Sequence, residues 1–396
     1  MEKKKTLVLL DMHAILHRGY HALPDFVSTK GEPTGALYGF TALLFKLSKE
    51  LSPDYIVAAY DLPEPTFRHK EYKDYKAGRA KTDDALIAQI IRSRDILDAF
   101  GIPRYELPGF EADDIIGTIS EHVKKSKNAE VIIASGDMDT LQLVDDGKVL
   151  VYTLRKGLSD TVLYDEKAVE TRYGFGPRFL IDYKGLAGDQ SDNIPGIRGI
   201  GEKSATLLIQ KFGDLEDIFR ALKKDEDEFK KAGVKPRLIE LLKEGEEEAL
   251  FSKALATIRR DAKINFEFPQ KKWGDSVDVS AAEKILSELE FKSLRARLPE
   301  VFGTSAEAPI EPEVEEEDVP KEELRKAKIA LWLLNSDITG PELSDILEFS
   351  GKKTFSEAKK WIFSELSERK LEKVYEEIEL PLVPIIEKME HRGILV

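Results

Sequence analysis

The sequence predicts an α/β fold in which helices cover both faces of a mostly parallel central sheet. Two observations carry this prediction. Short apolar runs alternate with segments of helical period over the first part of the chain, and from about Glu166 the pattern becomes mainly helical. Alternating strands and helices are typical of a layered α/β domain. A chain of 396 residues has room for two or three such domains.

The expected elements follow one another along the chain. Strands are expected at residues 6–10, 55–60, 104–107 and 131–134, with a hairpin at 149–154 and 161–164. Helices are expected at 35–51, 82–100 and 179–186, after Glu111 and from Thr140. The expected domains are an α/β core at 1–190, a helical part at 191–300, an acidic linker at 301–320 and an all-α segment at 321–396.

Composition restricts the class of protein. Hydrophobic residues make up 42% and charged residues 34% of the chain, and no apolar run approaches membrane-spanning length. The chain has no cysteine, which excludes disulfides and thiolate metal sites, and its first residues indicate a strand and not a signal peptide. We therefore expect a cytoplasmic monomer. The net charge of −14 argues against a protein that coats nucleic acid, although acids that bind cations are neutralised in use.

The stretch Pro108 to Gly117 contains three carboxylates, at Glu111, Asp113 and Asp114, directly before an apolar helical run. By itself it is typical of a helix start, where the helix dipole favours negative charge. At about 100° per residue, Glu111 and Asp114 lie on one flank of the helix and Asp113 points elsewhere. Whether the acids also have a chemical role depends on acids elsewhere in the chain.

Three further aspartates, Asp11, Asp61 and Asp137, each follow an expected buried strand. Each one alone could form a turn or a cap. Together they should meet the acidic helix start, because ligands bind at the carboxyl ends of strands in open α/β sheets. Such a cluster must be protonated or bind cations, and oxygen ligands without His or Cys favour Mg²⁺ or Mn²⁺. Two such ions suit hydrolysis of a phosphodiester.

Two other stretches indicate contacts with phosphate. Residues 196–201 carry glycines at 196, 199 and 201 before a helix, which favours either a backbone phosphate site or a tight interhelical turn. A dinucleotide site is disfavoured because no strong strand precedes these glycines. Residues 67–81 interleave Lys and Arg with aromatic rings. This pattern is typical of a segment that stacks on unpaired nucleobases and holds phosphates, but also of a solvated amphipathic segment.

The first 300 residues resemble the 5′-nuclease domain of bacterial DNA polymerase I, in the flap-endonuclease superfamily. The resemblance lies in ordered motifs, among them Tyr60-Asp61, Phe67-Arg68-His, Tyr75-Lys76-Ala-Gly-Arg79, Gly109-Phe-Glu111-Ala-Asp-Asp114, Gly136-Asp137-Met-Asp139, Gly188-Asp189-Gln-Ser-Asp192 and Gly199-Ile-Gly201-Glu-Lys203. It implies a two-metal site. Asp11, Asp61, Glu111 and Asp113 would serve one ion, and Asp137, Asp139 and Asp192 the other, with Asp114 and Asp189 acting directly or through water.

The same resemblance implies how DNA is bound. Residues 67–81 would form a helical arch over a single-stranded 5′ end, with Arg68 among its phosphate contacts, Lys76 and Arg79 at the scissile phosphate and Tyr75 stacked on a base. Arg18 and Tyr20 match positions near the active site. The glycine turn, with Gly199, Gly201 and Lys203, would be a helix-hairpin-helix variant that grips duplex backbone, often with a bound K⁺.

The sequence departs from the family at two positions and resembles a polymerase only in part beyond residue 320. Met12 and Met138 replace the Gly and Lys that family members usually carry, and neither supplies a metal ligand. Residues 328–335 resemble part of a proofreading-type domain, without its paired acids, and residues 380–395 resemble the opening of a polymerase domain. We expect an inactive remnant without polymerase activity, in a piece of a longer polymerase or a natural short form.

The predicted function is a Mg²⁺-dependent, structure-specific 5′ nuclease that removes 5′ flaps or RNA primers from duplex DNA in replication and repair. Lys76 and Arg79 would neutralise charge that develops on the phosphate, beside the catalytic acids Asp11, Asp61 and Asp113. Two alternatives stay open. One is a PIN-type single-strand ribonuclease, which shares acidic strand ends, and the other is a DNA-junction binder without catalysis.

Overall fold

The computed structural model describes residues 4–302, apart from 24–25, 127 and 157–159, and residues 320–383, apart from 336–340, 342, 351 and 353. The chain forms two compact units, residues 1–304 and 305–396. The expected boundary near residue 190 lies inside the first unit and stays a prediction. The expected acidic linker falls mainly on residues 303–319, outside the described residues.

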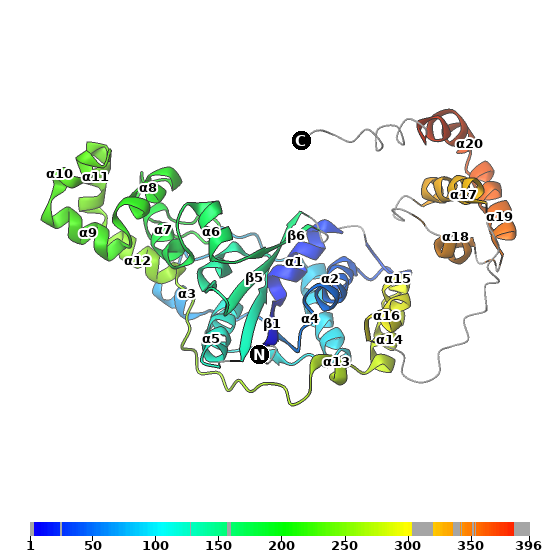
Figure 1. Cartoon of the computed structure of the whole chain (residues 1–396), viewed down its shortest axis with the longest axis horizontal. Coiled ribbons are helices and arrows are strands. Elements are labelled where there is room, and N and C mark those ends of the chain that lie inside the picture. Colours follow the sequence, from blue (N-terminus) through cyan, green and yellow to red (C-terminus); the bar gives the residue numbers. More distant parts are fainter. Residues whose placement is uncertain are drawn as a thin grey trace. The chain divides into compact units, whose positions relative to one another are not determined.

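A six-stranded sheet, in the order β3-β2-β1-β4-β5-β6, forms the centre of the first unit (Figure 1). Its strands are β1 (Lys5–Asp11), β2 (Tyr55–Ala59), β3 (Arg104–Tyr105), β4 (Ala129–Ala134), β5 (Val149–Lys156) and β6 (Asp160–Tyr164). All neighbours are parallel except β5 and β6, which pair antiparallel as the expected hairpin. The predicted mostly parallel sheet is therefore confirmed.

Helices cover both faces of this sheet, as predicted (Figure 1). On β1, Leu7 and Leu9 pack into one buried cluster with α5, whereas Val8 and Leu10 pack into another with α1, α2 and α4. Successive strand residues point to opposite faces, so a continuously apolar strand needs a layer on each side. The helices in this part are α1 (Met12–Ala22), α2 (Gly35–Leu51), α3 (Phe67–Glu71), α4 (Asp84–Ala99) and α5 (Ala112–Lys124).

Two expected helices are much shorter in the structure. The helix expected from Thr140 is a 3₁₀ helix, Met138–Leu143, in which the Asp137 side chain accepts a hydrogen bond from the Asp139 amide. The expected helical arch is helical only in α3, which ends where Tyr72 is extended (φ −138°, ψ 107°). Lys76 takes a left-handed conformation (φ 57°), which a helix cannot contain.

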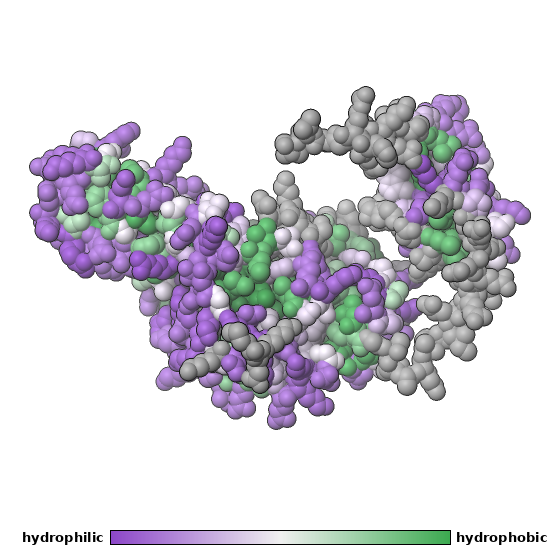
Figure 2. Space-filling model, viewed as in Figure 1, coloured by the Kyte–Doolittle hydropathy of each residue, from purple (hydrophilic) through white to green (hydrophobic). Residues whose placement is uncertain are grey.

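Beyond the sheet, the first unit continues as short helices. They are α6 (Glu166–Tyr173), a 3₁₀ turn (Pro177–Phe179), α7 (Leu180–Ala187), α8 (Glu202–Phe212), α9 (Leu215–Lys224), α10 (Glu226–Lys231), α11 (Pro236–Glu244), α12 (Glu246–Ala256), α13 (Trp273–Ser276), α14 (Val279–Glu288), α15 (Lys292–Ala296) and α16 (Leu298–Phe302). Helices α7 to α12 share the buried cluster on the α5 face. Their outer surface is largely hydrophilic (Figure 2). Helices α14 to α16 join the cluster on the opposite face.

The second unit is helical in the part that the structure describes, which confirms the predicted all-α segment. Its elements are α17 (Lys321–Leu334), α18 (Leu343–Ser350), α19 (Phe355–Glu368), α20 (Glu372–Val374) and a π-helical turn (Tyr375–Glu379). They pack around a small apolar core of their own. The expected polymerase opening at 380–395 lies mostly outside the described residues. Among the described helices, none combines the length and apolarity needed to cross a membrane.

Candidate active site

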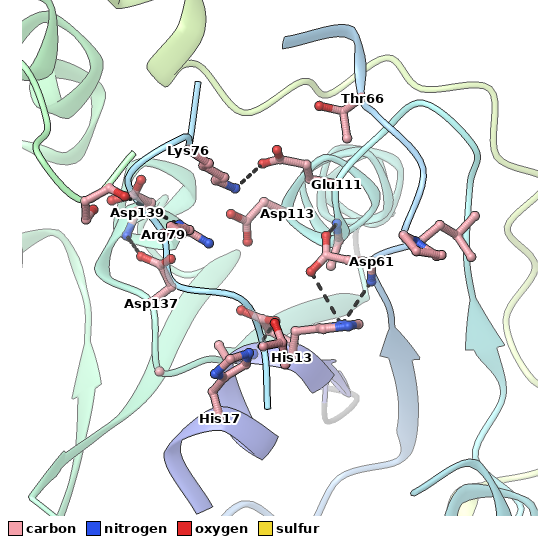
Figure 3. A pocket seen from close by; sticks show the side chains of 18 of the residues that line it. His13, His17, Asp61, Thr66, Lys76, Arg79, Glu111, Asp113, Asp137 and Asp139 are labelled. Atoms are coloured by element: carbon pink, nitrogen blue, oxygen red, sulfur yellow. Dashed lines mark hydrogen bonds and ion pairs between the residues drawn. The ribbon is translucent and has the colours of Figure 1, made fainter. Parts of the chain in front are cut away.

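The carboxyl ends of β1, β2 and β4 open onto a cavity of about 930 Å³. Register explains why the ends meet, since Asp11 lies opposite Ala59 on β2 and Leu10 lies opposite Ala134 on β4. The predicted residues on the cavity wall are Asp11, Arg18, Asp61, Lys76, Arg79, Glu111, Asp113, Asp137 and Asp139 (Figure 3). The structure thus brings the strand-end aspartates and two acids of the α5 start together.

Asp11 lies where β1 passes into α1. Its carboxylate accepts hydrogen bonds from the Ala14 amide at 3.2 Å and the Ser135 hydroxyl at 2.6 Å. Burial raises the pKa of Asp11 to about 7, and the charges of Asp61 and Asp137 act in the same direction. A carboxylate that resists ionisation in this way is stabilised by a nearby cation.

Asp61 is held by a residue that the sequence did not single out. Its carboxylate accepts the Ala112 amide at the α5 start at 2.7 Å, and its own amide donates to His13 Nδ1 at 3.1 Å. His13 Nδ1 also lies 3.4 Å from Asp61 Oδ2 (Figure 3). Burial lowers the pKa of His13, which favours the neutral ring that this acceptor geometry requires. The only sequence signal is a histidine two residues after Asp11.

Asp113 and Glu111 occupy the middle of the cavity (Figure 3). Burial, followed by the charges of Asp11 and Asp137, raises the pKa of Asp113 well above its usual range. Glu111 instead forms an ion pair with Lys76, whose Nζ lies 2.9 Å from Glu111 Oε2. The two acids of one helix start therefore differ in how their charge is balanced.

A second cation lies between Asp139 and Asp189. Lys184 of α7 forms an ion pair with Asp139 and lies 2.5 Å from Asp189 Oδ2. Burial raises the pKa of Asp139 to about 6, with Lys184 opposing the shift. Burial raises the pKa of Asp189, but the charge and hydrogen bond of Lys184 outweigh burial and lower this pKa to about 2. Lys184 is not among the predicted site residues, because only the fold shows that α7 faces the 3₁₀ helix after β4.

The segment after α3 folds over the acids. Arg79 forms an ion pair with Asp192, and the Lys76 amide donates to the Asp192 carbonyl at 2.9 Å. The Tyr75 hydroxyl lies 3.2 Å from both Glu111 Oε2 and Asp192 Oδ2, and the side chain is buried, with 3% exposed. Stacking of Tyr75 on a base, which the resemblance implied, does not fit this placement, because the ring is covered.

Two other predicted roles need correction. Asp114 is fully buried, and its carboxylate accepts both terminal nitrogens of Arg68 at 2.8 Å, so it points away from the cavity. The backbone amides of Glu111 and Arg259 fill its remaining acceptor positions. Asp114 therefore has no lone pair for a metal or its water. Arg68 is 2% exposed, too deeply buried to hold a phosphate.

The remaining predicted DNA contacts differ in how close they lie to the acidic cluster. Arg18 lines the cavity, whereas the Tyr20 hydroxyl hydrogen-bonds to Asp83, which raises its pKa. In the glycine turn, a Cβ at Gly196 would lie 2.1 Å from the Gly188 amide, so glycine is needed there for packing. Gly201 caps α8 in open space beside the exposed Lys203. Gly199 has a positive φ of 96°. The turn is thus tight, and its helix end is accessible.

The donor set fits a divalent cation that prefers oxygen. Apart from Asp114, the predicted ligands are carboxylates in or beside one cavity, and two of them have pKa values raised to about 6 and 7. Within the described part of the chain, no three such side chains already converge on one point. Lys76, Arg79 and Lys184 lie among them instead. Carboxylates gathered at the carboxyl ends of parallel strands are the arrangement with which α/β enzymes that act on phosphate esters bind divalent cations.

The chain belongs to the 5′-3′ exonuclease family. The model of the N-terminal resolvase-like domain of 5′-3′ exonucleases matches residues 6–174, and that of the C-terminal SAM-fold domain matches residues 175–278. DNA polymerase I of Bacillus subtilis is 40% identical over 319 residues, which are 81% of this chain and 35% of that protein. The thermostable DNA polymerase I of Thermus thermophilus is 35% identical over 313 residues, 78% of this chain and 35% of that protein.

Solved structures support the same fold. The 5′-exonuclease of T5, solved with bound divalent zinc ions, matches with a TM-score of 0.51 at 20% identity, over 75% of this chain and 100% of that chain. The bacteriophage T5 flap endonuclease, solved with DNA and metal ions, matches with a TM-score of 0.52 at 19% identity, over 76% and 100%. This chain spans about a third of the length of the polymerases that it matches.

Proposed function

We propose that this chain is a Mg²⁺-dependent, structure-specific nuclease that hydrolyses phosphodiester bonds at 5′ flaps and 5′ ends of duplex DNA, including RNA primers, in replication and repair. The observation that carries the proposal is the set of carboxylates around one cavity at the carboxyl ends of β1, β2 and β4. Family membership and the DNA in the T5 flap endonuclease structure support the substrate class.

In this proposal the acids divide into two groups of metal ligands. Asp11, Asp61, Glu111 and Asp113 would hold one ion, and Asp137, Asp139, Asp189 and Asp192 would hold the other. Mg²⁺ held by these acids would supply activation of water and charge stabilisation for an in-line displacement at phosphorus. Mn²⁺ would serve in the same role, since both ions prefer carboxylate oxygens.

The chain's own cations would act on the phosphate. Lys76 and Arg79 lie on the cavity wall, where Lys76 pairs with Glu111 and Arg79 pairs with Asp192. If a metal ion bound these two acids, Lys76 and Arg79 would be released to bind the scissile phosphate. Arg18 lines the same cavity. Charged donors fixed around a phosphate stabilise the charge that develops in the transition state. The product would carry a 5′-phosphate.

Duplex DNA would be held by the helical part. The open amino end of α8 at Gly201, beside Lys203, offers backbone amides and a positive dipole to a phosphate without reading bases. Bound K⁺ at this turn, the monomeric state, the cytoplasmic location and the lack of polymerase activity stay predictions.

Cleavage of a 5′-flap duplex in Mg²⁺ tests the proposal. We expect products with a 5′-phosphate, no cleavage in EDTA, and weak cleavage of unstructured RNA. Preference for the RNA would favour the PIN-type ribonuclease. Tight binding of flap DNA with no cleavage in Mg²⁺ or Mn²⁺ would contradict the proposal and favour the junction binder.

A further inference from the structure

Arg68 and Asp114 form a buried ion pair directly behind the acidic cavity. Arg68 Nη1 and Nη2 donate to Asp114 Oδ2 and Oδ1, each at 2.8 Å. The two side chains are 3% and 0% exposed. A planar guanidinium that meets both oxygens of a carboxylate fixes the orientation of both groups, which a lysine cannot do.

The pair also joins the end of α12 and the segment that follows it. Arg68 Nε donates to the Leu255 carbonyl at 2.9 Å, and its Nη2 donates to the Thr257 carbonyl at 2.7 Å. Asp114 Oδ1 accepts the Arg259 amide at 2.8 Å. Three stretches that are far apart in sequence, at α3, α5 and residues 255–259, are therefore held together by two side chains.

The contact that matters for the site is with Glu111. Asp114 Oδ2 accepts the Glu111 amide at 3.1 Å, and Arg68 Nη1 lies 3.6 Å from Glu111 Oε2. Glu111 is the N-cap residue of α5, and Asp113 follows two positions later. The pair thus contacts both the backbone and the carboxylate of Glu111, and Lys76 lies against the same carboxylate oxygen, Oε2.

We propose that Arg68 and Asp114 are a positioning pair that fixes the α5 start, and with it Glu111 and Asp113, for metal binding. The inference rests on the proposed function, because it concerns the geometry of the same metal site. Hydrogen-bonded partners behind metal ligands orient those ligands, and their loss weakens metal binding about 10- to 100-fold. Neither residue then needs to touch the metal or the DNA.

Binding of Mn²⁺ to the full chain without DNA, followed by electron paramagnetic resonance, tests the pair apart from cleavage. A single substitution would leave a charge buried alone, so the main variant is Arg68→Met combined with Asp114→Leu, which replaces the pair with apolar groups. We expect a lower melting temperature, because the Leu255 and Thr257 carbonyls and the Glu111 and Arg259 amides lose their partners, and Mn²⁺ binding by the folded protein about 10- to 100-fold weaker. Arg68→Lys keeps the charge but loses the fork, and should also weaken Mn²⁺ binding even if the double variant does not fold.

The matched control is an ion pair at the opposite edge of the sheet. Lys272 Nζ lies 2.6 Å from Asp54 Oδ1, just before β2 begins. Lys272→Met with Asp54→Asn should leave Mn²⁺ binding unchanged. Parental Mn²⁺ binding in folded Arg68 variants would overturn the inference, as would a loss confined to flap-DNA affinity in EDTA. A parent chain that binds no Mn²⁺ would instead contradict the proposed function itself.

Discussion

The acids around the cavity form two groups that differ in how their charge is balanced. Asp11 and Asp113 have raised pKa values, and within the described residues neither forms an ion pair with a lysine or arginine. The other acids form ion pairs: Glu111 with Lys76, Asp192 with Arg79, and both Asp139 and Asp189 with Lys184. We call these the unpaired and the paired group. The unpaired acids are neutralised either by protons or by an external cation, whereas the paired group carries counter-ions that a bound metal would have to displace.

The largest expected effect follows from removing a member of the unpaired group. Asp113→Asn should lower the cleavage rate roughly 10²- to 10³-fold, because charge stabilisation by a metal ion is worth several kcal/mol. Binding of flap DNA, measured by fluorescence anisotropy in EDTA, should change little. Asp84→Asn is the control, since this exposed acid at the start of α4 lies outside the cavity. Full activity of Asp113→Asn would mean that Asp113 is no ligand.

The second prediction concerns pH. The pKa of Asp11 is raised to about 7 and that of Asp139 to about 6, above their values in the unfolded chain. Protonated acids therefore stabilise the fold in acid, and this stability is lost as pH rises through 6 and 7. Without divalent metal, the melting temperature should fall between pH 5 and 8. Mg²⁺ should raise it more at pH 8 than at pH 5, and a rise independent of pH would contradict the account.

The third prediction concerns the paired group. Lys184→Met should tighten Mn²⁺ binding about tenfold, because loss of a unit charge a few Å away changes the electrostatic energy by 1 kcal/mol or more. Lys73→Met is the control, since Lys73 is an exposed cation on the segment after α3. Weaker Mn²⁺ binding in Lys184→Met would show that the lysine orders the acids and does not compete with the metal.

The smallest expected effect lies in the helical part. Lys203→Ala should weaken duplex binding severalfold at every sequence and lower the slope of log K against log salt by about 1. Lys211→Ala, at the other end of α8, should change neither quantity. An unchanged salt slope for Lys203→Ala would mean that the amino end of α8 does not contact the duplex.

The elements and residues that agree with prediction are those whose role depends on their neighbours in the chain. The strands, the hairpin and the α5 start agree with the periodicity, and the strand-end positions of Asp11, Asp61 and Asp137 led to the cavity. Agreement was weakest for side chains that meet across the fold. Arg68 and Asp114 are 46 positions apart, and nothing local distinguishes a ligand from the buried partner of a guanidinium.

The sequence by itself determined the layered α/β fold and the edge of the sheet at which the acids gather, because hydrophobic period and strand ends are local properties. Only the tertiary structure decided which acids face the cavity, that Asp114 turns inward to Arg68, and that His13 and Lys184 belong to the site. The physical reason is that charge balance and burial depend on contacts between distant segments, which the order of residues does not show.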